Sequence, residues 1–406
     1  MVKLLLAVLS LIFIMSSSRL INHQVRNDAQ IKYKPNIIII VSDDQGNADA
    51  GFQRSPSTIS TPSIDKLASD GIVFTDGYAS AYVCAPTRAG LLTGRYQQRF
   101  GFYTAGDSRQ GMPLTEITLA EVLKSEGYKT GAFGKWHLGL TKAYHPLSRG
   151  FDEFYGFLGH GAHDYFDLTC KDDPDDFHQC IYRNYKTIND TGYLTDNLAK
   201  EACSFIRSKA NQENPFFLYL PFNAVHWPLQ APEKDIKKFN TGDPERDIQL
   251  AMIHRMDIAV GEVIKTLKDE NIYENTIIFY FSDNGGAARV KADNLPLRDF
   301  KQSVYEGGLR VPFVMSWPAK FKPSVCNEPV ISLDIMPTVC AILGINLPED
   351  RVYDGKNILP AIKGKLKEPL HNELFWDGNQ KKWAVRQGNW KLVSPKEGVI
   401  ELYNLK

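Results

Sequence analysis

The chain has 406 residues, 43% of them hydrophobic, which is enough to bury a large core in two or three domain-sized units. Its 47 Lys and Arg residues balance 47 Asp and Glu residues, for a formal net charge of +0. A neutral chain has no overall field that attracts nucleic acid or an anionic membrane. Affinity for an anion must therefore come from a locally basic pocket.

The first element in chain order is an apolar N-terminal segment. Lys3 precedes an apolar stretch from Leu4 to Met15, and Ser16, Ser17 and Ser18 follow. The stretch is short for a membrane span and is typical of a secretory signal peptide, placed approximately at residues 1–21. We expect an exported protein (secreted, periplasmic or lysosomal), with no transmembrane span after signal cleavage.

Buried strands and amphipathic helices alternate along the rest of the chain. The expected strands are 36–41, 72–74, 129–133, 215–220, 276–281, 311–317, 383–386 and 390–393. The expected helices are 61–68, 119–126, 194–209, 247–269 and 333–343, and residues 144–193 are expected to be rich in loops. This alternation predicts an α/β fold with a large, mostly parallel sheet sandwiched by helices.

Polar side chains follow several of these strands where each strand ends. They are Asp43, Asp44, Lys135, His137, His226, Asp283 and Asn284. Ligands of open α/β sheets bind beyond the carboxyl ends of the strands. The oxygen ligands among these residues suit Ca²⁺ or Mg²⁺ better than zinc. Taken singly, Asp-Asp and Asp-Asn-Gly-Gly are turn or cap sequences, so the prediction of a metal site depends on their convergence.

A cysteine is predicted to lie at the start of a helix. Pro86 fits a first helical turn, whose N-terminus has unpaired N–H groups and the positive end of the dipole. Cys84 therefore lies where an anion would be held. It is either an activated thiolate, with a pKa lowered by the helix N-terminus and Arg88, or a small buried hydrophobic residue.

Two segments resemble the signatures of the sulfatase family. Cys84-x-Pro86-Thr87-Arg88, followed by Thr93-Gly94, is similar to the signature whose cysteine a dedicated enzyme oxidises to formylglycine (3-oxoalanine). Residues 127–137, GYKTGAFGKWH, are similar to the second signature. The resemblance runs from Asn36 to the end of the chain. It implies an alkaline-phosphatase-like catalytic domain over 34–360 and a small antiparallel α+β subdomain over 361–406, which is short for the family and is either naturally brief or a fragment.

The resemblance also implies a role for each site residue. One Ca²⁺ per subunit would be held by Asp43, Asp44, Asp283, Asn284 and the oxygen of the modified Cys84. Arg88, Lys135 and Lys301 would neutralise the sulfate with the metal, and Lys301 precedes the family-like Tyr305-Glu306-Gly307-Gly308. One hydroxyl of the hydrated aldehyde would attack sulfur, and the second would release sulfate with His137 as base. His226, with Lys301, would protonate the leaving group. Without the family motifs, the two histidines are structural residues and Lys301 is a surface lysine.

In an exported chain, the number of cysteines indicates how many disulfides can form. If Cys84 is modified, five of the six cysteines remain, and at least one is unpaired. Cys170 and Cys180 flank a polar loop and are the pair that we expect to be joined. The pairing of Cys203, Cys326 and Cys340 stays open.

The sequence thus predicts an exported, calcium-dependent sulfatase, acting on a sulfated carbohydrate rather than on a simple aryl sulfate. Export, the aromatic and histidine-rich middle loops, and the resemblance of residues 96–101 and 295–298 to carbohydrate-desulfating members favour the carbohydrate. The formylglycine-generating enzyme is the expected maturation partner. The alternatives are an arylsulfatase, a phosphomonoester or phosphonate hydrolase of the same superfamily, and a catalytically silent glycan-binding protein with unmodified Cys84.

Overall fold

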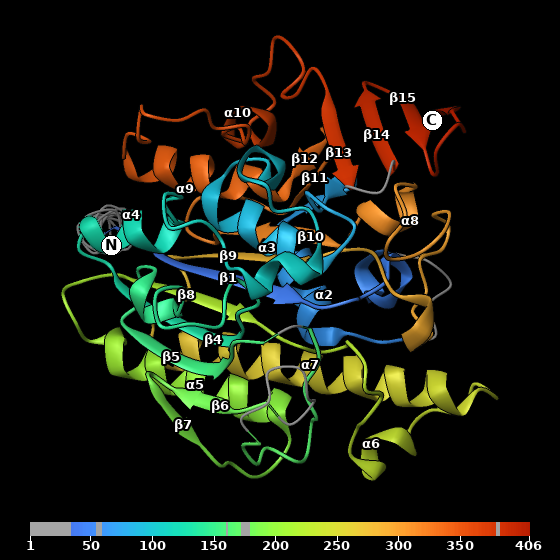
Figure 1. The fold of residues 1–406 in the computed structure, drawn as a ribbon. Helices are drawn as coiled ribbons and strands as arrows, with labels where there is room; N and C mark the ends of the chain where they lie inside the picture. Colours follow the sequence, from blue (N-terminus) through green and yellow to red (C-terminus); the bar gives the residue numbers. More distant parts are fainter. Residues whose placement is uncertain (1–33, 54–58, 160, 172–178, 379–381) are drawn as a thin grey trace, which may run out of the picture.

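The computed structural model describes residues 34–53, 59–159, 161–171, 179–378 and 382–406. The expected signal peptide lies outside these residues. A large central sheet is covered by helices on both faces, and a small sheet formed by the C-terminal residues packs at one edge (Figure 1). Among the described residues, no helix combines the length and the apolar character needed to cross a membrane.

Ten strands of the described chain form the central sheet, in the order β11-β2-β10-β9-β1-β8-β4-β5-β6-β7. They are β1 (Asn36–Ser42), β2 (Ile72–Phe74), β4 (Lys129–Lys135), β5 (Glu153–Phe157), β6 (Ile181–Arg183), β7 (Lys186–Ile188), β8 (Phe216–Pro221), β9 (Thr276–Ser282), β10 (Phe313–Ser316) and β11 (Ser324–Cys326). The central strands β9, β1, β8, β4 and β5 are parallel, whereas β10 and β6 run antiparallel to their neighbours. The predicted fold class, a mostly parallel sheet between helices, is confirmed.

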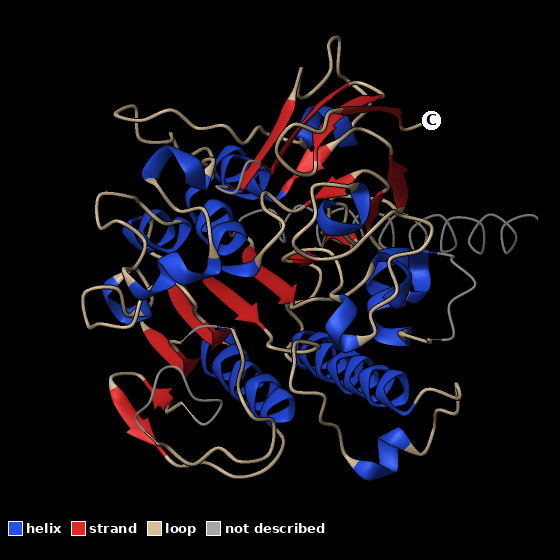
Figure 2. Cartoon of the chain, turned by 45° about the vertical axis from the view of Figure 1, so that its right-hand side comes forward, coloured by secondary structure: helices blue, strands red, loops and turns tan. Residues whose placement is uncertain are grey.

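The helices build one core on each face of the sheet. They are α2 (Pro62–Ser69), α3 (Cys84–Thr93), α4 (Leu119–Ser125), α5 (Leu194–Ala210), α6 (Glu233–Ile236), α7 (Pro244–Asp269), α8 (Glu306–Leu309), α9 (Ile335–Leu343) and α10 (Leu359–Ile362). Helices α2, α5 and α7 cover one face, and α3, α4 and α9 cover the other (Figures 1 and 2).

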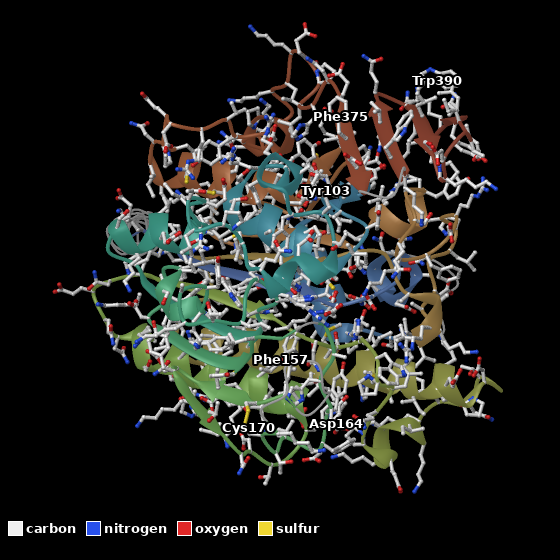
Figure 3. The ribbon with its side chains drawn as sticks, viewed as in Figure 1. Tyr103, Phe157, Asp164, Cys170, Phe375 and Trp390 are labelled. Carbon is white, nitrogen blue, oxygen red and sulfur yellow. A yellow bond between two sulfur atoms is a disulfide. The ribbon has the colours of Figure 1, made fainter. Side chains whose placement is uncertain are left out.

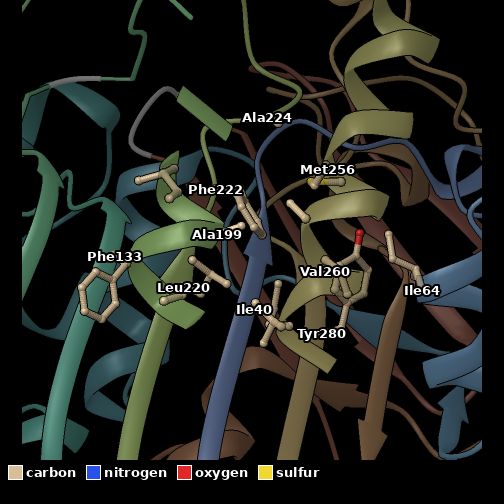
Figure 4. Packing of buried hydrophobic residues seen from close by; sticks show 14 of the residues in the cluster. Ile40, Ile64, Phe133, Ala199, Leu220, Phe222, Ala224, Met256, Val260 and Tyr280 are labelled. Atoms are coloured by element: carbon tan, nitrogen blue, oxygen red, sulfur yellow. The ribbon is translucent and has the colours of Figure 1, made fainter. Parts of the chain in front are cut away.

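Strand β1 contributes to both cores because successive side chains of a strand point to opposite faces. Ile38 and Ile40 pack with α5 and α7, while Ile37 and Ile39 pack on the face covered by α3. Figure 4 shows Ile40 beside Leu220 and Tyr280 of the neighbouring strands, under α5 and α7. The continuous apolar run is therefore buried on both sides, as the sequence predicts.

The middle of the chain has more strand structure than the sequence indicates. Strands β5, β6 and β7 lie within residues 144–193, where we expected loops. Strand β5 reads EFYGF, in which a glycine interrupts the aromatic residues that favour a strand, and β6 and β7 have only three residues each, so none forms a long strand pattern. The expected Cys170–Cys180 disulfide is confirmed (Figure 3), while Cys203, Cys326 and Cys340 are buried free thiols.

Several element boundaries also differ from those expected, among them those of α7 and β10. Helix α7 begins at Pro244 rather than at residue 247, because the Asp243 side chain caps it by accepting hydrogen bonds from the N–H groups of Glu245 and Arg246. Strand β10 is shorter than the expected 311–317 and is antiparallel to β9.

The small sheet is antiparallel and consists of β13 (Leu374–Gly378), β14 (Lys382–Gln387), β15 (Trp390–Ser394) and β16 (Glu401–Asn404). It carries the exposed rings of Phe375 and Trp390 (Figure 3). Gly378 packs so close to Tyr82 that a Cβ there would lie 1.6 Å from the Tyr82 hydroxyl oxygen. The proposed domain boundary between residues 360 and 361 stays a prediction.

A buried ion pair joins the small sheet to the rest of the protein. Lys391 of β15 is 1% exposed, and its Nζ lies 2.6 Å from a carboxylate oxygen of Glu306 in α8. The Tyr78 hydroxyl donates to the other oxygen at 2.8 Å. Burial opposes the charge of Glu306, yet Lys391 and the hydrogen bonds hold its pKa below the ordinary value.

We expect Lys391→Ala to destabilise the protein by roughly 3–5 kcal/mol, because it leaves the Glu306 carboxylate buried without its main cation. The midpoint of urea unfolding measures this effect. Lys396→Ala is the matched control, since Lys396 is exposed on the connection after the same strand. Equal midpoints for the two variants would contradict the anchoring role of the pair.

Candidate active site

The structure brings all of the sequence-predicted site residues together at the carboxyl ends of four parallel strands. Asp43 and Asp44 follow β1, Asp283 and Asn284 follow β9, and Lys135 ends β4. His137 follows β4 by two residues and His226 lies beyond the end of β8. Cys84 begins α3, which carries Arg88, and Lys301 comes from the segment before α8.

Arg88 is fully buried and joins two of the carboxylates. Its Nη2 and Nε donate to Oδ2 of Asp283 at 2.7 and 3.0 Å, and Nη2 also reaches Oδ2 of Asp43 at 3.2 Å. Its Nη1 donates to the Lys135 carbonyl at 3.0 Å, and Lys135 Nζ in turn donates to Oδ2 of Asp43. Burial and the nearby Asp43 raise the pKa of Asp283. Burial would also raise the pKa of Asp43, but Lys135, His226 and Arg88 hold it well below its usual range.

Asp44 is the centre of a second group of contacts. Its Oδ1 lies 2.7 Å from Lys301 Nζ and accepts a hydrogen bond from Asn284 Nδ2 at 2.7 Å. Its Oδ2 lies 3.6 Å from His226 Nε2. Burial opposes the charge of Lys301, but Asp44 outweighs it and the pKa of Lys301 is raised. Burial lowers the pKa of His226 to about 4.

The carboxylate and amide oxygens of the site that accept no hydrogen bond suit a divalent cation. Among the described residues, Oδ1 of Asp43, Asp283 and Asn284 are buried and accept no hydrogen bond. Ligand atoms of Asp43, Asp283 and Cys84 lie within 4.8 Å of one another. Buried polar atoms are normally satisfied, and these oxygens have the hardness that Ca²⁺ or Mg²⁺ prefers. The residues present therefore fit the predicted ion.

The charges of the site favour binding of an anion once a cation is bound. Three buried acidic side chains, Asp43, Asp44 and Asp283, face three basic ones, Arg88, Lys135 and Lys301. These six charges cancel, so a divalent ion would leave the site positive. A positive, largely buried site attracts and holds an anionic substrate.

Of the two interpretations of Cys84, the small buried residue fits the structure better than the activated thiolate. Cys84 is 2% exposed, and burial raises the pKa of its thiol despite the nearby Lys135 and Lys301. Arg88 does not reverse this effect, because its guanidinium is engaged by Asp283 and Asp43. Reactivity at this position must therefore come from something other than a low thiol pKa.

Strained backbone occurs next to the site. Asp44 and His137 have φ values of 60°, and Gln302 has a φ value of 69°. These φ values lie in the left-handed region, which residues other than glycine rarely adopt. Residues held in this conformation cluster at functional sites. The conformations of Asp44 and His137 occur directly after β1 and β4, and only the Asp-Asp pair, as a turn sequence, gives a sign of them in the sequence.

A pocket of about 570 Å³ opens above Cys84. Residues that we predicted line it together with others that we did not: Val83, Cys84, Ala105, Gly106, Arg109, His137, Gly161, Ala162, His226, Trp227, Arg289, Lys301 and Gln302. Arg109 ends η4 (Ala105–Arg109), and Arg289 lies in η6 (Ala288–Val290). Both come from short irregular segments without a motif, so only the neighbouring Asp283-Asn284 and His226 could have suggested Arg289 and Trp227. A larger groove of about 850 Å³ beside Phe375 contains none of the predicted catalytic or metal-binding residues, but Tyr96, Gln98 and Arg99 of the segment 96–101 line it.

Comparison with known proteins gives one consistent family. The family model described as Sulfatase matches residues 35–345, and that described as N-sulphoglucosamine sulphohydrolase, C-terminal, matches residues 299–406. The uncharacterized sulfatase YdeN of Escherichia coli (strain K12) is 32% identical, over 87% of this chain and 70% of its own. The N-acetylgalactosamine-6-sulfatase of Canis lupus familiaris is 33% identical, over 88% and 71%.

Solved structures agree with these relatives. The crystal structure of Ps i-CgsB in complex with k-i-k-neocarrahexaose is 37% identical and covers 92% of this chain and 86% of that chain, with a TM-score of 0.86. The phosphonate monoester hydrolase of Agrobacterium radiobacter has a TM-score of 0.67 at 20% identity, over 91% and 89%, and thus shares the fold.

Proposed function

Since the chain belongs to the sulfatase family and is a hydrolase of sulfate esters, we propose that it desulfates a carbohydrate through a formylglycine formed from Cys84 and one bound calcium ion. The observation that carries this proposal is the position of Cys84. It begins α3 at the floor of the pocket, with a ligand atom within 4.8 Å of those of Asp43 and Asp283.

A formylglycine at position 84 would explain how this residue can react although its thiol is not activated. Its hydrated aldehyde would supply the hydroxyl that attacks sulfur. The buried thiol has a raised pKa and is a soft ligand beside hard oxygen donors. An oxygen at this position would match both the ligand set and the chemistry. We propose a formylglycine-generating enzyme as the maturation partner.

Asp43, Asp44, Asp283 and Asn284 would hold the calcium ion, which would draw charge from the sulfate oxygens. The chain's own cations would share this task. Arg88 and Lys135 lie on the Asp43 side of the site, and Lys301 lies beside Asp44 at the pocket wall. Sulfate would thus be held between fixed positive groups before its ester bond is attacked.

His137 and His226 line the same pocket as Cys84. His226 Nδ1 donates to the Trp227 carbonyl at 2.8 Å, which fixes the ring and leaves Nε2 to contact the leaving oxygen. We propose that Lys301, which Asp44 keeps protonated, gives the proton to the leaving oxygen beside His226, and that His137 is the base for release of sulfate.

We propose a carbohydrate rather than a simple aryl group as the part of the substrate that leaves. Trp227 and Val83 are its main large apolar lining residues, and arginine, lysine, histidine and glutamine side chains surround them. Hydroxyl-rich leaving groups can form hydrogen bonds with these polar side chains, and Trp227 offers a ring on which a sugar can pack. The names of relatives that act on N-acetylgalactosamine-6-sulfate or bind a neocarrahexaose support this choice.

We also propose that the protein is exported. Lys3, the apolar run from Leu4 to Met15 and the three serines after it support a cleaved signal peptide. The Cys170–Cys180 disulfide is consistent with an oxidising compartment.

Mass analysis and a substrate comparison test the proposed function together. The tryptic peptide of residues 67–88 should be about 18 Da lighter than its cysteine form, because the thiol becomes an aldehyde. The protein should turn over 4-nitrophenyl sulfate faster than 4-nitrophenyl phosphate, and sulfated sugars faster than either. An unmodified peptide without turnover would favour the silent glycan-binding protein, and a preference for phosphate would favour a phosphoester hydrolase.

A further inference from the structure

Arg289 is placed at the pocket by an aromatic contact. Its guanidinium carbon lies 3.9 Å from the centre of the Trp227 ring. The side chain is exposed, and among the described residues no carboxylate forms an ion pair with it. A guanidinium stacked on a ring keeps its edge N–H groups available, in a planar fork that matches carboxylate and sulfate oxygens.

The described charged side chains that line the pocket around Arg289 are all basic. Among the residues that the structure describes, the lining of the pocket includes Arg109, Arg289 and Lys301 and no aspartate or glutamate. Lys301 is balanced by Asp44 at the floor of the pocket. The positive charge of Arg289 thus remains for a ligand at the mouth, where none of the described lining residues is acidic and would repel an anion.

Arg289 lies close to the position proposed for the leaving group, because Trp227, on which it stacks, is next to His226. Trp227 directly follows His226, and its carbonyl accepts the hydrogen bond from His226 Nδ1. His226 is the residue proposed to contact the leaving oxygen. A group bound by Arg289 would therefore belong to the sugar that leaves, not to the sulfate that is cleaved.

We propose that Arg289, held on Trp227, binds a second anionic group of the substrate, so that the enzyme prefers carbohydrates with another sulfate or a carboxylate close to the ester that is cleaved. This inference rests on the proposed function. A neutral hydroxyl would use only one N–H of the fork, whereas a sulfate or carboxylate uses two and also neutralises the charge. The volume of about 570 Å³ lies within the usual range of about 300–1,000 Å³ for small-molecule sites, so the pocket has room for sugar as well as sulfate.

The test compares wild type with Arg289→Gln on three matched galactose disaccharides that share one sulfate ester. The first has no other anion, the second has another sulfate, and the third has a carboxylate. We expect wild type to have a higher kcat/KM on one or both dianionic substrates. Arg289→Gln should lower kcat/KM on the preferred one about tenfold and leave the monosulfated one within about twofold. The preferred dianion identifies the second group.

Two variants serve as controls. Arg183→Gln makes the same change in an exposed arginine that lies over the Tyr155 ring but outside the pocket, and it should leave all three values unchanged. Arg289→Lys keeps the charge but not the fork, and should recover part of the preference. Equal losses on all three substrates in Arg289→Gln, or an unchanged preference, would overturn the proposal.

Binding to Cys84→Ala, measured by calorimetry with the same disaccharides, separates this inference from the proposed function. Tighter binding of a dianionic sugar that disappears in Cys84→Ala/Arg289→Gln supports the second-anion site even if wild type shows no turnover. Turnover of sulfate esters without any preference for dianionic sugars in rate or binding would leave the proposed function intact and refute the role of Arg289.

Discussion

Cys84→Ser is expected to abolish multiple turnover, with kcat lower by on the order of 10⁴-fold or more, as for removal of other catalytic nucleophiles. Serine at this position could take sulfate from a substrate but would be left as a stable sulfate ester, because it has no second hydroxyl to expel it. The variant should therefore release no more than one equivalent of alcohol. Mass spectrometry of the peptide of residues 67–88 should then show one added sulfate group.

The fold of this variant should persist, because serine is close to cysteine in shape and Cys84 forms no disulfide. Thermal unfolding and circular dichroism check this point. Cys203→Ser is the matched control, since Cys203 is also a buried free thiol but lies on α5, where it packs in the core on the other face of the sheet from α3. It should remain active. Sustained turnover by Cys84→Ser would contradict the aldehyde mechanism.

Much of the fold was readable because it depends on local patterns. The apolar run of β1 is buried on both faces as predicted, and the polar residues directly after β1 and β9 meet because parallel strands end at one edge. Strands β5, β6 and β7 were missed because they are short, with five, three and three residues, and only their pairing with neighbouring strands reveals them.

The floor of the site was predictable, whereas its wall was not. Asp43, Cys84 and Asp283 stand in motifs, but Arg289 and Trp227 come together only through the path of loops. The raised thiol pKa of Cys84 also depends on how deeply α3 is buried, which the sequence of the helix does not determine. Sequence therefore predicts the reaction better than the substrate.

Asp283→Asn is expected to remove the metal ion and lower kcat/KM by on the order of 10²–10³-fold, comparable to the loss of other groups that stabilise transition-state charge. The substitution keeps the shape of the side chain but loses one of the three carboxylate charges that face Arg88, Lys135 and Lys301. The remaining site would be positive without any ion, so a divalent cation would be repelled. Asp283→Ala is a poorer test, because Arg88 is fully buried and would lose its hydrogen bonds of 2.7 and 3.0 Å as well.

Calcium binding to the folded state gives a measurement that does not depend on activity. A ligand that binds only the native state raises the unfolding temperature in proportion to the logarithm of its concentration above Kd. Calcium added to chelator-treated wild type should therefore raise Tm, and Asp283→Asn should lose this shift.

Asp257→Asn is the control for loss of a buried carboxylate. Asp257 is 1% exposed, accepts hydrogen bonds from the N–H groups of Ser63 and Ile64 at the start of α2, and is not one of the predicted metal ligands. Its substitution should lower Tm with and without calcium by the same amount, because it weakens a helix terminus and leaves the ion in place. An undiminished calcium shift and metal content in Asp283→Asn would mean that the ion binds elsewhere. The three buried oxygens of Asp43, Asp283 and Asn284 would then need another partner.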